Sequence, residues 1–134
     1  MPKVVVDKVR IPFVQRATLK VKGVPSTAFL VDLAMEGVFI ESARQPALRE
    51  VVAVSFCLPG NAIPLEARGA VAWVHEKGSP PRGFPSGFGM RFVEMDVTHR
   101  ARLREYLAEY CRRGPKSRRF ARPWPTAGAL GGEP

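Results

Sequence analysis

The sequence predicts a mostly β domain, in which six short antiparallel strands form a closed or nearly closed barrel and one C-terminal α-helix packs against it. Three observations lead to this fold class. Runs rich in β-branched and aromatic residues recur between residues 17 and 93, with turn signals between them. After residue 93 the hydrophobic period changes from two to 3.6. With 134 residues, 46% hydrophobic and 25% charged, the chain has the size and composition of one globular domain.

The elements are expected in a simple order along the chain. Residues 1–16 form a basic N-terminal arm, because Pro12 removes a backbone donor and biases Ile11 to an extended conformation. Residues 17–113 form the barrel and helix, and residues 114–134 form a flexible basic tail. The expected strands are residues 17–22, 27–33, 38–41, 51–58, 65–75 and 86–93.

Two of these elements carry further expectations. In the strand 65–75, Gly69 is expected to mark a bulge or bend, and Trp73 shares a face with Val71. The helix is expected between an N-cap at Asp96 or Thr98 and a stop at Gly114-Pro115. Its apolar stripe comprises Leu103, Tyr106, Leu107, Tyr110 and Cys111.

Positive charge is concentrated at both ends of the chain. The net charge is +9; residues 1–22 carry six Lys and Arg against one Asp, and residues 100–122 carry nine against two Glu. Residues 23–99 carry six basic and eight acidic side chains. This distribution favours an anionic partner near the termini, such as a nucleotide, a nucleic acid or an acidic protein surface.

The segment around which the domain is organised is Phe29–Ser42, FLVDLAMEGVFIES. Two β-rich runs flank a polar corner at residues 32–37, where Gly37 can adopt a positive φ and let the chain reverse. Asp32 can accept hydrogen bonds from backbone N–H groups of the corner, or present its carboxylate to a ligand.

Several short motifs, taken together and in this order, resemble the PilZ family over about residues 7 to 112. They are Arg10-Ile-Pro-Phe, Asp32-Leu-Ala-Met-Glu-Gly37-Val-Phe-Ile, Phe56-x-Leu58-Pro59, Gly69-x-Val71-x-Trp73 and Gly87-Phe-Gly-Met90-Arg-Phe92. The family shows a basic arm, a β-barrel and a C-terminal helix. Its members typically bind cyclic di-GMP through an R-x-x-x-R motif in the arm and a D-x-S-x-x-G motif at the corner.

The resemblance implies a set of ligand-binding residues and two departures from the motif. Arg10 corresponds to the second arginine of the family motif, whereas Val6 stands where the first is expected. Asp32 and Gly37 match the corner motif, and Ala34 replaces its serine. Further cations could come from Lys3, Lys8 or Arg16, although the spacing from Arg10 to Arg16 does not fit the motif.

Each of these residues also has a purely structural interpretation. Arg10 could be a solvated cation of the arm, Asp32 a capping carboxylate, and Gly37 a turn residue. Core packing explains Trp73 and Phe88 without any role in stacking on bases. The nucleotide-receptor hypothesis requires Arg10 and the Asp32 carboxylate to converge on one surface.

Three functional hypotheses follow. The first is a PilZ-type module that senses cyclic di-GMP through Arg10, Asp32, Ala34 and Gly37. The second is a degenerate PilZ adaptor that binds a bacterial motility, pilus, exopolysaccharide or other regulatory protein without nucleotide. The third is a nucleic-acid-binding protein that uses the basic helix and tail.

The sequence contains no recognisable motif for other classes of function. We expect no enzyme, because no nucleophile–base pair or Gly-rich phosphate loop is recognisable. We expect no metal, because Cys57, Cys111, His75 and His99 have no ligand spacing. Without a visible signal peptide or membrane span, a cytoplasmic protein is expected.

Overall fold

The computed structural model describes residues 6–43, 45–78 and 85–113; the expected tail lies outside them. A short 3-10 turn, η1 (Val6–Lys8), precedes six strands and one α-helix. They are β1 (Arg10–Val21), β2 (Val24–Ala34), β3 (Gly37–Glu41), β4 (Val51–Phe56), β5 (Leu65–His75), β6 (Gly87–Met95) and α1 (Val97–Arg113). The predicted number of strands and the final helix are confirmed for this part of the chain.

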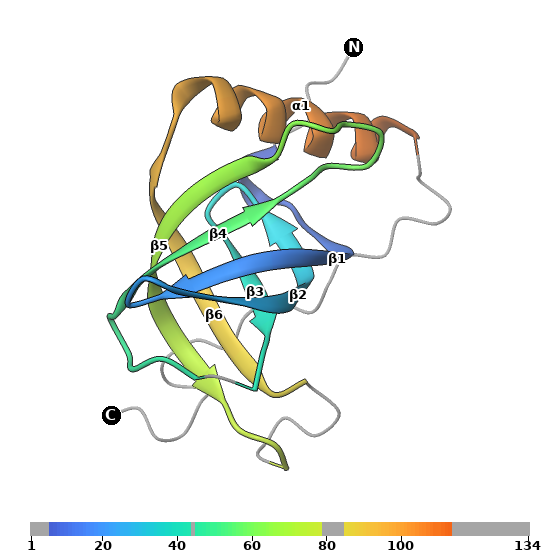
Figure 1. The fold of residues 1–134 in the computed structure, drawn as a ribbon. Coiled ribbons are helices and arrows are strands. Elements are labelled where there is room, and N and C mark those ends of the chain that lie inside the picture. Colours follow the sequence, from blue (N-terminus) through green and yellow to red (C-terminus); the bar gives the residue numbers. More distant parts are fainter. Residues whose placement is uncertain (1–5, 44, 79–84, 114–134) are drawn as a thin grey trace.

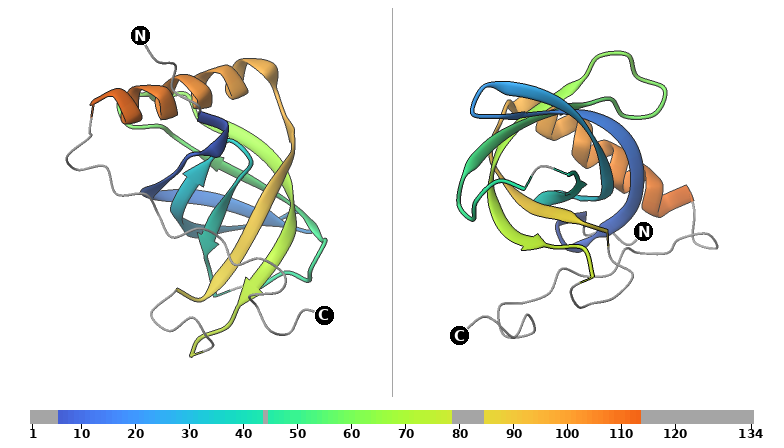
Figure 2. Two further views of the ribbon diagram at one scale, coloured as in Figure 1. Left: turned by 180° about the vertical axis from the view of Figure 1, so that it is seen from behind. Right: turned by 60° about the horizontal axis from the view of Figure 1, so that its bottom comes forward.

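The six strands close into an antiparallel barrel in the order β1-β2-β3-β6-β5-β4. The barrel is closed because β1 pairs with β2 on one side and with β4 on the other. Figure 1 shows α1 lying across one end of the barrel, and the right-hand view of Figure 2 shows the strands as a ring. A closed sheet has no free edge, and because hydrophobic side chains fill this barrel, polar functional groups are expected on its outer face or at its ends.

A tight hairpin joins β1 to β2. Lys22 and Gly23 both have positive φ, 53° and 79°, as a two-residue turn between twisted strands requires. The four residues between the expected strands 17–22 and 27–33 are therefore too many for the turn, because Val24 and Pro25 already pair with β1. The right-handed twist of the strands selects the shorter connection.

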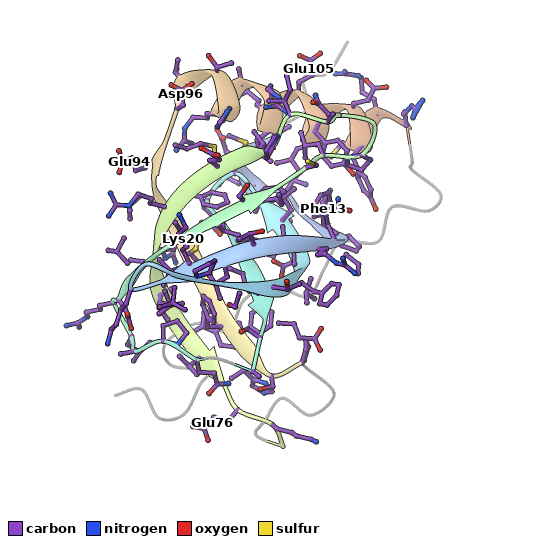
Figure 3. All side chains as sticks on the ribbon, viewed as in Figure 1. Phe13, Lys20, Glu76, Glu94, Asp96 and Glu105 are labelled. Carbon is purple, nitrogen blue, oxygen red and sulfur yellow. The ribbon has the colours of Figure 1, made fainter. Side chains whose placement is uncertain are left out.

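The hydrophobic core fills the barrel and continues to α1. Leu103 and Leu107 of the helix are completely buried and belong to the same cluster as the barrel residues. The Phe13 ring, labelled beneath α1 in Figure 3, makes edge contacts with Phe56 at 5.9 Å and Tyr106 at 5.7 Å between centroids. These contacts attach the helix to β1 and β4.

The start of the helix distinguishes between the two expected N-caps. The Asp96 Oδ2 atom accepts a hydrogen bond from the Thr98 backbone N–H at 3.2 Å. Asp96 is therefore the N-cap, which satisfies a backbone donor that the first helical turn leaves without a partner. The helix continues to Arg113, and the expected stop signal at Gly114-Pro115 lies outside the described residues.

The barrel begins earlier than the sequence predicts. Residues 10–16 were expected in the arm, but β1 starts at Arg10, and Ile11 and Phe13 are buried. Pro12 is tolerated because it points outward and lies at a register shift between Pro12 and Gln15 in the β1·β2 pair. Burying Ile11 and Phe13 on the core side of the strand stabilises β1 by more than the one backbone hydrogen bond that Pro12 cannot donate.

Two register shifts in the β5·β6 pair determine which way Trp73 faces. One lies between Arg68 and Gly69, as expected for Gly69, and another lies between Val71 and Trp73. Beyond the second shift, Val74 packs against the main core. Because neighbouring side chains alternate, Trp73 faces the other side of the sheet, and the expectation that it shares a face with Val71 is wrong.

The phenol of Tyr106 gives a testable pH dependence. Burial raises the pKa of Tyr106 above its usual 10.0, and the neighbouring Tyr110 adds to the rise. Above about pH 10 the unfolded chain therefore binds fewer protons than the folded chain, so the free energy of unfolding falls as pH rises. Denaturant unfolding across this range should show a smaller decline for Tyr106→Phe than for the unaltered protein. Equal slopes would contradict the assignment.

Candidate functional site

Two of the predicted ligand residues meet at the beginning of β1 and the end of β2. The Arg10 Nη1 atom donates to Asp32 Oδ1 at 2.9 Å, and the side chains are 9% and 2% exposed. The two strands bring them together because Pro12 pairs with Asp32 and Arg10 pairs with Ala34. The predicted convergence of a cation and an acceptor is confirmed, but Arg10 is a buried strand residue and not a solvated arm cation.

Asp32 also stabilises the third strand. The same Oδ1 atom accepts the Phe39 backbone N–H at 2.9 Å. This bond lies next to a register shift between Leu30 and Asp32 in the β2·β3 pair. A carboxylate that accepts from a guanidinium and a backbone donor is well satisfied in a buried position. Asp32 therefore joins β1, β2 and β3.

An exposed ion pair continues this buried one towards solvent. The Glu36 carboxylate accepts from Arg10 Nη2 at 3.0 Å and from Arg91 Nη1 at 3.3 Å, one oxygen to each guanidinium. Glu36 is 52% exposed and Arg91 is 58% exposed. We call Arg10, Asp32, Glu36 and Arg91 the arginine–acid cluster; it has a buried inner pair and an exposed outer pair.

Gly37 is required for a different reason from the one the sequence suggested. It is not among the residues with positive φ. Instead, a Cβ atom at Gly37 would lie 2.1 Å from the Met90 carbonyl oxygen of β6. Gly37 pairs with Arg91, so its missing side chain lets β3 and β6 approach closely. The expectation of a positive-φ turn residue is therefore wrong.

The two departures from the family motif occupy structural positions. Ala34 is 3% exposed and lies opposite Arg10 in the β1·β2 pair. Val6 is 5% exposed and belongs to the main hydrophobic core. A guanidinium at Val6 would have to displace core packing, so the chain uses this position for stability. Lys8 is exposed, and Lys3 lies outside the described residues.

Arg16 is not part of the cluster. It lies further along β1, beyond the register shift, and pairs with Phe29. Its guanidinium carbon lies 6.0 Å from the centroid of the Phe29 ring, within reach of a cation–π contact. The structure thus gives Arg16 an aromatic neighbour on β2 and does not place it with Arg10 and Asp32.

Aromatic side chains pack beside the arginine–acid cluster. Phe39 and Trp73 pair with the same residue, Gly89, on either side of β6. Their ring centroids are 5.1 Å apart, and Trp73 also contacts His75 at 6.2 Å. Phe39 and Trp73 are buried but are not part of the main core cluster. Gly89 therefore lets a second aromatic cluster form across β6, whereas Phe88 packs in the main core as expected.

Sequence reasoning missed Glu36, Arg91 and Gly89 as members of this region. Glu36 lies within the recognised corner, but its role depends on which cations face it. Arg91 and Gly89 approach the corner only because β3 pairs with β6, a connection between strands distant in the sequence. Only correct pairing of these strands would have identified them.

The basic face of α1 is partly neutralised by acidic neighbours. Arg104 pairs with Asp7 at 3.2 Å, and Arg112 and Arg113 pair with Glu109 at 2.7 and 3.2 Å. Figure 3 also shows Glu105 on the outer side of the helix, and Glu94 and Asp96 where β6 leads into α1. These acids weaken the case for a nucleic-acid surface on the helix.

The described residues also bear on metal binding and on membrane insertion. No three His, Cys, Asp or Glu side chains gather there as metal ligands would. None of the helices in residues 6–113 that the structure describes is both long and apolar enough to cross a bilayer.

Comparisons with known proteins identify the family and the fold. The sequence model of the PilZ domain matches residues 7–109. The fold is similar to a solved structure of the Bacillus subtilis inhibitor of motility MotI/DgrA, with a TM-score of 0.69 and 11% identity. That alignment covers 87% of this chain but 55% of the other, so the chain spans about half of that protein's length. No curated protein sequence matches this chain. The chain belongs to the PilZ family, a class of regulatory domains.

The close approach at Gly37 predicts a large cost for added volume. Gly37→Ala should lower the free energy of unfolding by about 3 kcal/mol or more, because the obstructing atom belongs to the backbone of β6. Gly60→Ala is the control: Gly60 has a φ of 77° and open space around it. It should cost only about 1–2 kcal/mol. Urea unfolding measures both, and equal losses would contradict this role for Gly37.

The layered ion pairs predict unequal effects of removing the two acids. Asp32→Ala removes the buried acceptor of Arg10 and of the Phe39 N–H, and should cost about 3–5 kcal/mol. Glu36→Ala removes the exposed acceptor of the same guanidinium and should cost less than about 1 kcal/mol. Denaturant midpoints of the two variants provide the comparison. A cost for Glu36→Ala as large as that for Asp32→Ala would refute the distinction.

Proposed function

We propose that this PilZ domain is a regulatory module that binds cyclic di-GMP beside the arginine–acid cluster and acts through contacts with another protein. The observation that carries this proposal is the 2.9 Å contact between Arg10 and Asp32, two residues of the family's ligand motifs. A guanidinium can bind phosphate oxygens in bidentate fashion. A carboxylate can accept from the N–H edge of guanine.

The substitutions at Val6 and Ala34 should weaken the affinity for the nucleotide. A lost charge-assisted hydrogen bond costs roughly 1.5–3 kcal/mol, and a lost neutral one about 0.5–1.5 kcal/mol. Together they correspond to a loss of roughly two to three powers of ten in affinity. A domain that retains Arg10, Asp32 and Gly37 would therefore be a weaker receptor than one with the complete motif.

A second candidate function is an adaptor that works without nucleotide. Its support is the burial of Arg10 against Asp32, together with the use of Val6 in the core. In this arrangement the motif residues hold the barrel together, and the partner surface lies elsewhere. The structural neighbour is named as an inhibitor of motility. That name favours a motility or related regulatory protein as the partner of either form.

Calorimetry with cyclic di-GMP separates the two functions. Saturable heat that is lost in Arg10→Gln but retained in Arg16→Gln supports the receptor. Arg16 is the matched control because it lies on the same strand but outside the cluster. If folded protein gives no heat at high micromolar ligand, the receptor proposal fails and the adaptor remains.

A second measurement guards against misfolding of Arg10→Gln, since Arg10 is buried. Amide NMR signals of the unaltered protein should move at Ala34 and Gly37 on addition of cyclic di-GMP. Signals of the β1–β2 turn at Lys22 and Gly23 should not move. Shifts confined to that turn would contradict binding at the cluster.

A further inference from the structure

We propose that Arg91 of β6 is the second arginine of the phosphate site and that Glu36 blocks this site as a built-in competitor. This inference rests on the proposed binding of a phosphate-bearing ligand beside Arg10. It adds two residues at positions that the family's two ligand motifs leave unspecified. It also names the chemistry they would recognise, a phosphate group that carries at least one negative charge.

The first support is the geometry of the Glu36 carboxylate. Its two oxygens each accept from a different arginine, at 3.0 Å from Arg10 Nη2 and 3.3 Å from Arg91 Nη1. Two non-bridging oxygens of a phosphate can bridge two guanidinium groups in the same manner. Glu36 therefore occupies a position that a phosphate can take.

The second support is the difference in burial within the cluster. Asp32 is 2% exposed and Arg10 is 9% exposed, whereas Glu36 and Arg91 are both more than half exposed. An exposed ion pair is stabilised by at most about 1 kcal/mol, a factor of roughly five in affinity. A ligand can thus displace Glu36 at little cost while the Arg10–Asp32 pair remains intact.

The third support is that the backbone fixes both members of the outer pair. The Phe92 backbone N–H donates to the Glu36 carbonyl oxygen at 2.9 Å, and Gly37 pairs with Arg91. The close approach at Gly37 keeps β3 against β6. The backbone of Arg91 is therefore held beside the corner. A cation from β6 can replace the one absent at Val6.

Charge balance explains why Glu36 controls affinity. The four side chains of the cluster carry two positive and two negative charges, so an approaching dianion meets no net attraction from them. Glu36→Gln leaves a polar side chain of the same size but removes one negative charge. Displacing an amide from two guanidinium groups also costs less than displacing a carboxylate.

The barrel contains a matched pair for the control variants. Arg68 and Glu94 form an exposed ion pair at 3.2 Å between β5 and β6, and Arg68 has the same 58% exposure as Arg91. Arg68→Gln and Glu94→Gln therefore make the same charge changes without altering the cluster. They report the effect of net charge alone.

The test measures binding of two probes, cyclic di-GMP and inorganic pyrophosphate, to the full chain and its variants. Glu36→Gln should bind about fivefold more tightly than Glu94→Gln. Arg91→Gln should bind more weakly than Arg68→Gln. The gain from Glu36→Gln should disappear in the double variant that also carries Arg91→Gln. Arginine side-chain NMR signals of Arg91 should shift with ligand in Glu36→Gln.

The outcomes separate this inference from the proposed function. If Glu36→Gln binds pyrophosphate more tightly through Arg91 while cyclic di-GMP binds no variant, the Glu36 competitor stands and the nucleotide receptor fails. If cyclic di-GMP binds the unaltered protein but Glu36→Gln matches Glu94→Gln, the receptor stands and the competitor is overturned. If neither probe binds Glu36→Gln more tightly than Glu94→Gln, the competitor is likewise overturned.

Discussion

The buried ion pair between Arg10 and Asp32 is the interaction on which this end of the barrel depends. Burying two charges is unfavourable unless they are paired and their remaining hydrogen-bonding groups are satisfied. Here the Asp32 carboxylate accepts from Arg10 and from the Phe39 N–H, so one side chain links β1, β2 and β3. The pair fixes where the β2–β3 corner lies. The β3·β6 pairing, in turn, places Arg91 beside that corner.

The anion binding that we propose at this site depends on the different burial of the inner and outer pairs. The inner pair is nearly inaccessible, and separating Arg10 from Asp32 would leave a buried charge without its partner. Glu36 and Arg91 are solvated, and their contacts can be replaced at small cost. The contact between Arg10 and Asp32 therefore supplies rigidity, whereas Arg91 and the Arg10 Nη2 atom that faces Glu36 are the groups that an anion would contact. A domain of this kind can lose part of a ligand motif without losing its fold, because the motif residues that remain also hold the strands together.

The sequence predicted the barrel well because that prediction depends on local patterns. The alternation of hydrophobic and polar residues, the turn residues and the change of hydrophobic period are all visible within short stretches of sequence. It failed where distant strands determine the outcome. Pro12 indicates an extended arm when only its sequence neighbours are considered, but it lies in β1 at a register shift that tolerates it. Trp73 changes face because of a second shift that no short window reveals. Of the site, the Arg10–Asp32 convergence was predictable from the family resemblance, whereas Arg91 depends on the β3·β6 pairing.

The position of Val6 explains why the second arginine of the proposed phosphate site comes from another part of the barrel. Val6 packs in the main core, and an arginine there would either bury a charge or pull η1 away from the barrel. Simple restoration of the family motif is therefore costly in this chain. The strand next to the corner is β6, held there by the close approach at Gly37, and its outward-facing residue beside Glu36 is Arg91. The pairing of β3 with β6 thus brings a cation from a distant strand beside Glu36, where it can compensate for the arginine that is missing near the N-terminus.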